Sequence, residues 1–137
     1  MMAETESNRS TTRILFLRFA LVGVAGFLVD AGALTLALSL GADLYTGRMF
    51  SFFCAVTATW YMNRIYTFSS KDTRLLHEWG RFVSANAIGG LINYAAYALL
   101  VSTIGLFASY PIIAVAVGSL AGLLWNFTVS HKLVFAK

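Results

Sequence analysis

Apolar residues fill most of the chain in long stretches, and short polar or charged segments separate these stretches. A bilayer core about 30 Å thick takes about 20 apolar residues of helix to cross. The uncharged stretch from Phe82 to Ser130 is too long for one crossing, and Gly105 and Pro111 divide it in two. The pattern therefore predicts four transmembrane helices, at about residues 14–40, 48–68, 81–104 and 109–131.

The segment before the first apolar stretch is polar and contains Glu4, Glu6 and Arg9. It is too polar for the apolar core of a signal peptide, and it has too few apolar residues to pack as a folded element. Residues 1–12 are therefore predicted to be a disordered tail. Residues 13–137 are predicted to form one transmembrane domain of four helices.

Lysine and arginine are distributed unevenly over the ends of the predicted helices. Of the ten, all but Arg48 lie in the N-terminal segment and the start of the first helix, in the loop between the second and third helices and at its edges, or in the C-terminal segment. Cytoplasmic segments of membrane proteins are enriched in these residues. The sequence therefore predicts a single orientation, in which the middle loop and both termini are cytoplasmic.

The composition supports an integral membrane protein. Hydrophobic residues make up 58% of the chain and charged residues only 12%, whereas soluble domains have about 25% charged residues. The net charge is +4, but the cations lie between apolar segments. Anionic lipids are therefore the expected partners, and no nucleic acid is expected. The single Cys54 excludes an intramolecular disulfide and a cysteine-based metal site.

The two halves of the chain resemble each other. A shift of 63 residues carries Arg18 onto Arg81 and Asp30 onto Asn93, and a shift of 67 relates the second predicted helix to the fourth. Small and polar residues form a stripe on one face of each helix, which allows close helix contacts. Each half begins and ends on the same side, so the repeats run parallel. The predicted fold class is an all-α integral membrane protein, with four transmembrane helices built from two parallel two-helix repeats.

Asp30 is the only charged residue after Arg18 in the first apolar stretch. It lies about 18 Å along the helix from Arg18, near the middle of a bilayer. A lone acid there costs about 2.5–3.5 kcal/mol, so it should face protein, water or a partner. Arg48 lies about 24 Å from Arg64 along the second helix. If Arg18 and Arg64 lie at the same level in the membrane, Arg48 is about 6 Å farther from that level than Asp30. An ion pair between Asp30 and Arg48 is one interpretation, a functional role for Asp30 is another, and both can hold.

Short motifs recur in a specific order along both halves. They are Arg18-Phe19, Val22-Gly23, Asp30, Asn63-Arg64 and Thr67-Phe68 in the first half, and Arg81-Phe82, Asn93, Asn126-Phe127 and Val134-Phe135 in the second. In this order and duplication, nearly the whole chain resembles the GtrA-like family of bacterial membrane proteins. The resemblance implies a protein of the bacterial cytoplasmic membrane that moves a polyprenyl-phosphate-linked sugar from the inner to the outer leaflet, for glycosylation of cell-surface polysaccharide or teichoic acid. It also implies a separate membrane glycosyltransferase that loads the sugar.

Polar residues on the predicted helices are candidates for binding the phosphate or sugar of such a lipid. They are Arg18, Asp30, Arg48, Asn63, Arg64, Arg81, Asn86, Asn93 and Asn126. Arginine can hold a phosphate through two parallel hydrogen bonds, and Arg64 is the strongest candidate because it follows the polar stripe that ends at Asn63. The alternative for the arginines at helix ends is topology alone. The alternative for the asparagines is interhelical hydrogen bonding, worth about 0.6 kcal/mol on average.

Enzyme activity is not expected, because the sequence has no catalytic constellation, no Gly-rich phosphate loop and no acidic metal cluster. No cofactor or metal is expected either. Two other functions stay open: an accessory subunit that anchors or positions a glycosyltransferase, and a small-multidrug-type exporter, which the charge bias and the parallel repeat disfavour. Four spans enclose little space for a sugar, so a homo-oligomer is expected, most simply a parallel homodimer.

Overall fold

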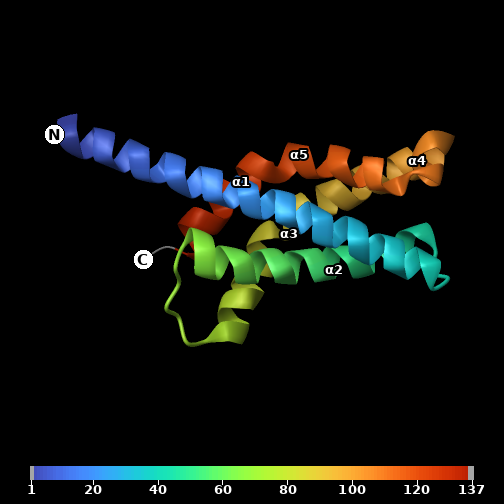
Figure 1. The fold of residues 1–137 in the computed structure, drawn as a ribbon, viewed down its shortest axis with the longest axis horizontal. Helices are drawn as coiled ribbons and strands as arrows, with labels where there is room; N and C mark the ends of the chain where they lie inside the picture. Colours follow the sequence, from blue (N-terminus) through green and yellow to red (C-terminus); the bar gives the residue numbers. More distant parts are fainter. Residues whose placement is uncertain (1, 136–137) are drawn as a thin grey trace.

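The computed structural model describes residues 2–135, and all regular structure in this range is helical. Four long helices form two pairs, α1 with α2 and α3 with α5 (Figure 1). The elements are α1 (Met2–Ser39), α2 (Leu44–Met62), the π-helical turn η1 (Asn63–Thr67), α3 (Leu75–Thr103), the short α4 (Gly105–Ser109), α5 (Pro111–Val129) and the π-helical turn η2 (Ser130–Val134). The predicted all-α class is confirmed for this part of the chain.

A tight turn joins α1 to α2. Gly41 has a φ of +95°, in the left-handed region that favours glycine. Asp43 then caps α2, since its carboxylate accepts hydrogen bonds from the backbone N–H groups of Tyr45 (2.8 Å) and Thr46 (3.1 Å). The hydrogen bond from the Thr46 hydroxyl and those from the two N–H groups hold the pKa of Asp43 below its usual value. The cap defines where α2 begins.

The second helix pair is connected by α4. Ile104 and Tyr110 flank this short helix, and Pro111 occupies the first turn of α5. Proline suits that position because the first N–H groups of a helix have no intrahelical partner. The predicted break between the third and fourth apolar stretches is therefore a short helix with a proline-started helix after it.

Both helix pairs end in a π-helical turn at one end of the molecule, called here the π-helix end (Figure 1). In each turn a phenylalanine N–H donates to the carbonyl five residues earlier: Phe68 to Asn63 at 2.9 Å and Phe135 to Ser130 at 3.0 Å. The rings of Phe68 and Phe135 stack with centroids 4.5 Å apart. The two chain segments thus meet at this end through equivalent aromatic residues.

Two apolar clusters hold the bundle together, one near each end. The cluster at the π-helix end is aromatic, and its buried members are Phe19, Val56, Trp60, Phe68, Phe82, Phe127, Val134 and Phe135. The cluster at the α4 end contains Leu34, Tyr97, Val101, Ala114 and Val115. The outer surface is also apolar, with exposed side chains such as Leu21, Leu28, Leu91 and Leu120. A bundle that is apolar outside as well as inside is suited to lipid surroundings.

The N-terminal segment differs from the prediction of a disordered tail, because α1 is helical from Met2 onward and extends beyond the bundle (Figure 1). The segment contains no proline or glycine, and three of its hydroxyl groups form hydrogen bonds within the helix. Ser10 and Thr11 donate to the carbonyl of Ser7, and Thr12 donates to that of Asn8. Residues 7–14 are exposed, so this extension is held by its own hydrogen bonds.

Two helices of the described chain are long and apolar enough to cross a membrane, Ser7–Ser39 and Leu75–Thr103. A third crossing results if Pro111–Leu120 and Trp125–Val134, which are bent by 54°, form one span. The sequence predicts four spans, but polar and charged side chains lower the hydropathy of α2. The third helix also begins at Leu75 instead of 81, so part of the predicted charged loop is helical.

Candidate functional site

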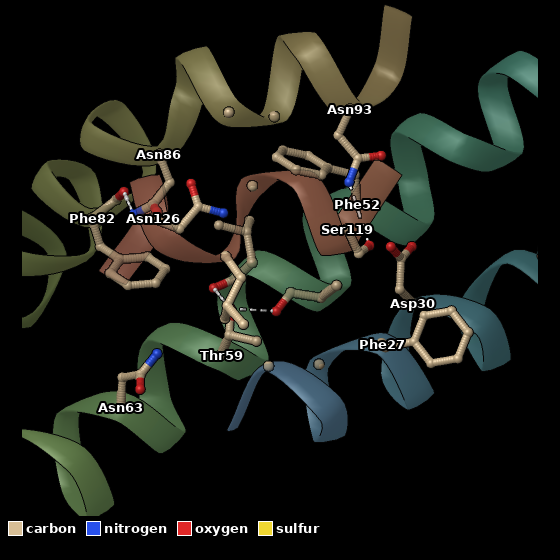
Figure 2. Close-up of a pocket in the computed structure, with 18 of the residues that line it drawn as sticks. Phe27, Asp30, Phe52, Thr59, Asn63, Phe82, Asn86, Asn93, Ser119 and Asn126 are labelled. Atoms are coloured by element: carbon tan, nitrogen blue, oxygen red, sulfur yellow. Dashed lines mark hydrogen bonds between the residues drawn. The ribbon is translucent and has the colours of Figure 1, made fainter. Parts of the chain in front are cut away.

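A polar cavity of about 140 Å³ lies between the two helix pairs, and residues of α1, α2, α3 and α5 line it (Figure 2). Six of the predicted candidate residues line this cavity together: Asp30, Arg48, Asn63, Asn86, Asn93 and Asn126. Arg18, Arg64 and Arg81 do not line it. The predicted residues therefore fall into a central group and a group at the π-helix end.

The predicted ion pair between Asp30 and Arg48 is present. Nη1 of Arg48 donates to Oδ1 of Asp30 at 2.7 Å and lies 3.2 Å from the Ser51 hydroxyl. The exposed fractions of the two charged side chains are only 7% for Asp30 and 1% for Arg48. Two charges this deeply buried are tolerated only when they are paired.

Arg48 also links the two helix pairs. Its Nη2 donates to Oδ1 of Asn93 on α3 at 2.9 Å, and the Asn93 amide nitrogen lies 3.4 Å from the Ser119 hydroxyl on α5. In Figure 2 the Asp30 carboxylate points toward this Asn93–Ser119 pair. The Arg48 guanidinium lies 5.6 Å from the centre of the Tyr97 ring. One side chain thus contacts α1, α2 and α3 in the middle of the bundle.

Two buried polar atoms at the cavity have no hydrogen-bond partner among the described residues: Nε of Arg48 and Oδ1 of Asn126. A buried polar group without a partner costs about 1–3 kcal/mol, and more when it is charged. A water molecule or a ligand in the cavity removes this cost when it forms the missing hydrogen bond. Among the described residues, the Arg48 Nε–H donor and the Asn126 Oδ1 acceptor are therefore without a partner and could bind a water molecule or a ligand at this site.

The other two asparagines of the cavity are satisfied by neighbouring residues. The amide nitrogen of Asn86 donates to the Phe82 carbonyl at 2.7 Å and lies 3.2 Å from the Ser130 hydroxyl. Oδ1 of Asn63 accepts from the Thr67 hydroxyl at 2.7 Å. These two residues help to connect the helices and to close η1, which matches the structural interpretation of the sequence.

Glycines allow these polar side chains to lie against the opposite helix. A Cβ on Gly118 would be 2.7 Å from Oδ1 of Asn93, and a Cβ on Gly89 would be 2.5 Å from Oδ1 of Asn126. A Cβ on Gly26 would collide with Thr59. The small-residue stripes therefore have the packing role that the sequence predicts, and they also make room for the asparagines.

A second ion pair joins Arg64 to Glu78 at the π-helix end. Nη1 of Arg64 lies 2.8 Å from Oε1 of Glu78, and Nη2 donates to the Asp72 carbonyl at 2.6 Å. Glu78 is 2% exposed, accepts from the Trp60 indole at 3.0 Å, and also accepts from the Ser70 hydroxyl. Arg64 thus ties the loop after η1 to the start of α3. Sequence reasoning missed Glu78, whose only signal was an isolated acid beside Trp79 at the edge of an apolar stretch.

The other two arginines at this end form matching contacts. Arg18 on α1 donates to the Tyr66 carbonyl of η1 at 3.3 Å, and Arg81 on α3 donates to the Leu133 carbonyl of η2. Both arginine side chains are exposed. Each binds the π-helical turn of its own helix pair, and whether either also binds a phosphate stays a prediction.

Comparison with known protein families assigns the chain to one of them. The model of a family described as "GtrA/DPMS, transmembrane domain" matches residues 18–135. This match confirms the resemblance inferred from the motifs. The family is associated with the handling of sugar-linked lipids in membranes, and its members are generally not catalytic. Among curated proteins, no sequence matches the chain.

Proposed function

Because the chain belongs to the GtrA/DPMS transmembrane-domain family, we propose that it moves a polyprenyl-phosphate-linked sugar from the inner to the outer leaflet of the bacterial cytoplasmic membrane. The observation that carries this proposal is the polar cavity between the helix pairs. It contains a buried ion pair, and two of its buried polar atoms have no partner in the described part of the chain, inside a bundle whose outer surface is apolar. Polar groups at this depth are costly and usually serve transport or binding.

The proposal includes four membrane crossings arranged as two parallel repeats. Helix α2 would be the fourth crossing, since its 19 residues extend about 28 Å and its polar side chains face the cavity. Matching contacts support the repeat: the arginine–carbonyl pairs Arg18–Tyr66 and Arg81–Leu133 are related by the shifts of 63 and 67 residues.

The π-helix end is proposed to face the cytoplasm, because Arg18, Arg64 and Arg81 all lie there. The lipid would enter from this end. Outward movement of its phosphate anion is then favoured by an inside-negative potential, at about 2.3 kcal/mol per charge per 100 mV. Labelling of single cysteines in a Cys54-free background tests this orientation: Lys71→Cys should react only from the cytoplasm and Phe107→Cys only from outside.

The cavity of about 140 Å³ has room for several water molecules. A sugar headgroup therefore requires the helix pairs to separate, or a second copy to contribute to the path. We propose a parallel homodimer with twofold symmetry as the simplest such assembly. Crosslinking in native membranes should show the dimer, and monomer alone would contradict it.

A leaflet-accessibility assay tests the transport function directly. Purified protein is reconstituted into liposomes that carry a labelled polyprenyl-phosphate sugar in one leaflet, and its appearance in the other leaflet is followed. We expect faster exchange than in protein-free liposomes. Exchange at the protein-free rate would refute the proposal, provided that the reconstituted protein is shown to be folded and inserted.

The small cavity favours one alternative, an accessory subunit that positions a membrane glycosyltransferase without moving lipid. In that case a glycosyltransferase would co-purify with the protein, and the Asp30→Asn variant would retain surface glycosylation. The transport function predicts loss of glycosylation for this variant at wild-type abundance.

A further inference from the structure

The hydrogen bonds of Arg48 leave one edge of its guanidinium only partly satisfied. Nη1 is occupied by the Asp30 carboxylate at 2.7 Å and lies 3.2 Å from the Ser51 hydroxyl. Nη2 has only a neutral partner, the amide oxygen of Asn93 at 2.9 Å. Nε has no partner among the described residues. The acid therefore holds one end of the guanidinium, while the edge formed by Nε and Nη2 is only partly satisfied.

This edge has the chemistry of an anion site. The Nε–H and one Nη2–H of arginine point in parallel and form the fork that holds carboxylates and phosphates through two hydrogen bonds. An oxyanion on this edge would satisfy the free Nε and replace the neutral Asn93 oxygen with a charged acceptor. Asp30 would keep its place on Nη1.

We propose that the Nε–Nη2 edge of Arg48 binds the phosphate of the lipid ligand, and that this phosphate displaces Asn93. The proposal rests on the proposed function and specifies where the charged group of the substrate pauses. Among the residues that line the cavity, Arg48 is the only cation and Asp30 the only anion. The arginines at the π-helix end are outside the cavity, and Arg64 already bonds to Glu78 and to the Asp72 carbonyl.

Displacement of Asn93 has a consequence for the bundle. The Arg48–Asn93 hydrogen bond joins the α1–α2 pair to α3, so a phosphate that replaces it removes a link between the helix pairs. Ligand binding and separation of the helix pairs are thereby coupled. This coupling provides the space for a headgroup that a cavity of about 140 Å³ lacks.

The test is direct binding of a short-chain polyprenyl phosphate to the full-length protein in detergent, with the corresponding polyprenol as the probe without phosphate. Removing the like charge of Asp30 should strengthen phosphate binding, so Asp30→Asn is expected to lower the Kd about tenfold. Asn93→Asp places a second carboxylate on Nη2 and should raise the Kd about tenfold or more. Both variants should leave polyprenol binding unchanged.

Asn93→Asp also tests the site without leaving Arg48 unpaired, because in this variant both terminal nitrogens of Arg48 have a carboxylate partner. The matched control is Asp72→Asn, which removes a loop carboxylate that forms an ion pair with the exposed Arg74; it should leave the Kd unchanged. Competition by inorganic phosphate with the same dependence on the variants would show that free phosphate suffices at this edge. Unchanged or weakened binding in Asp30→Asn, or tighter binding in Asn93→Asp, would overturn the assignment.

Failure of this inference is distinguishable from failure of the proposed function. If binding depends on the phosphate, and Asp30→Asn lowers the Kd while Asn93→Asp raises it, but no lipid moves between leaflets, transport is refuted and the Arg48 site is kept. If the protein moves the lipid between leaflets, but Asp30→Asn and Asn93→Asp change the Kd in the same direction and to the same extent, the site is refuted and transport is kept.

Discussion

The two ion pairs of the bundle are alike in geometry and differ in what surrounds them. Nη1 of Arg48 lies 2.7 Å from Oδ1 of Asp30 in the middle of the bundle, and Nη1 of Arg64 lies 2.8 Å from Oε1 of Glu78 at the π-helix end. Both acids are buried. Both terminal nitrogens of each arginine have partners, and Glu78 also accepts from the Trp60 indole and the Ser70 hydroxyl. Among the described residues, the buried Nε of Arg48 has no hydrogen-bond partner.

This difference separates a structural pair from a binding site. A buried ion pair is by itself weak evidence for stability or function, since its Coulomb gain is offset by the cost of desolvation. What distinguishes Arg48 is a buried Nε–H that has no partner among the described residues, beside a polar cavity between the two helix pairs. Arg64, in contrast, serves to attach a loop to α3. The comparison gives four predictions, ordered by the expected size of the effect.

Removal of the central cation should have the largest effect on stability. Arg48→Gln leaves the Asp30 carboxylate buried without a partner, which typically costs about 3–5 kcal/mol. The double variant Asp30→Asn with Arg48→Gln removes both charges and should recover most of the loss. Thermal unfolding of the purified variants measures both effects, and equal losses in the single and double variants would show that the pair is not coupled.

Removal of the outer acid should have a smaller and more local effect. Glu78→Gln breaks the pair with Arg64, whose side chain is 14% exposed, so water replaces part of the lost interaction. We expect a loss of about 2–3 kcal/mol and faster hydrogen exchange in residues 68–74. Affinity for polyprenyl phosphate should stay at the wild-type value. A drop in that affinity would make the π-helix end part of the binding site and remove the contrast between the two pairs.

Glycine substitutions test whether the Asn93 contact depends on close packing. Gly118→Ala would place a Cβ 2.7 Å from Oδ1 of Asn93 and should push this amide away from Arg48, at a cost of about 1–3 kcal/mol. A Cβ on Gly32 of α1 would have nothing within 4 Å apart from its chain neighbours and the backbone of its own helix, so Gly32→Ala is the matched control and should not lower the melting temperature. Equal melting temperatures for the two variants would contradict the packing argument.

The exposed pair of Asp72 and Arg74 should contribute least. Hydrogen bonds from the backbone and side chain of Arg74 hold the pKa of Asp72 below its usual value of 3.8. Any stabilisation by this pair is therefore complete above pH 3.8 and is lost as the pH falls through the lowered pKa. Because the pair is solvent-exposed, Arg74→Gln should leave the melting temperature at pH 7 unchanged. A measurable decrease would place the loop among the stabilising elements of the bundle.

Much of the site follows from axial positions that can be counted along the chain. The depth of Asp30 and the start of the second helix at Arg48 predict their contact, which the structure contains. The helix bounds are less predictable, because the polar N-terminal segment and the charged stretch after Leu75 are both helical although their polarity suggests a tail and a loop. Glu78 was missed because its partners, Trp60 and Arg64, come from another helix pair and meet it only through packing.

The sequence by itself determined the helical class, the family and the depth of the charged pair, because a rise of about 1.5 Å per residue converts spacing into height. Only the tertiary structure decided which nitrogens of each arginine are occupied. That outcome depends on the lateral approach of helices and on side-chain rotamers. The stripe that ends at Asn63 favoured Arg64 as the phosphate ligand. In the described part of the chain, however, Arg64 is paired with Glu78, and the donor without a partner is Nε of Arg48.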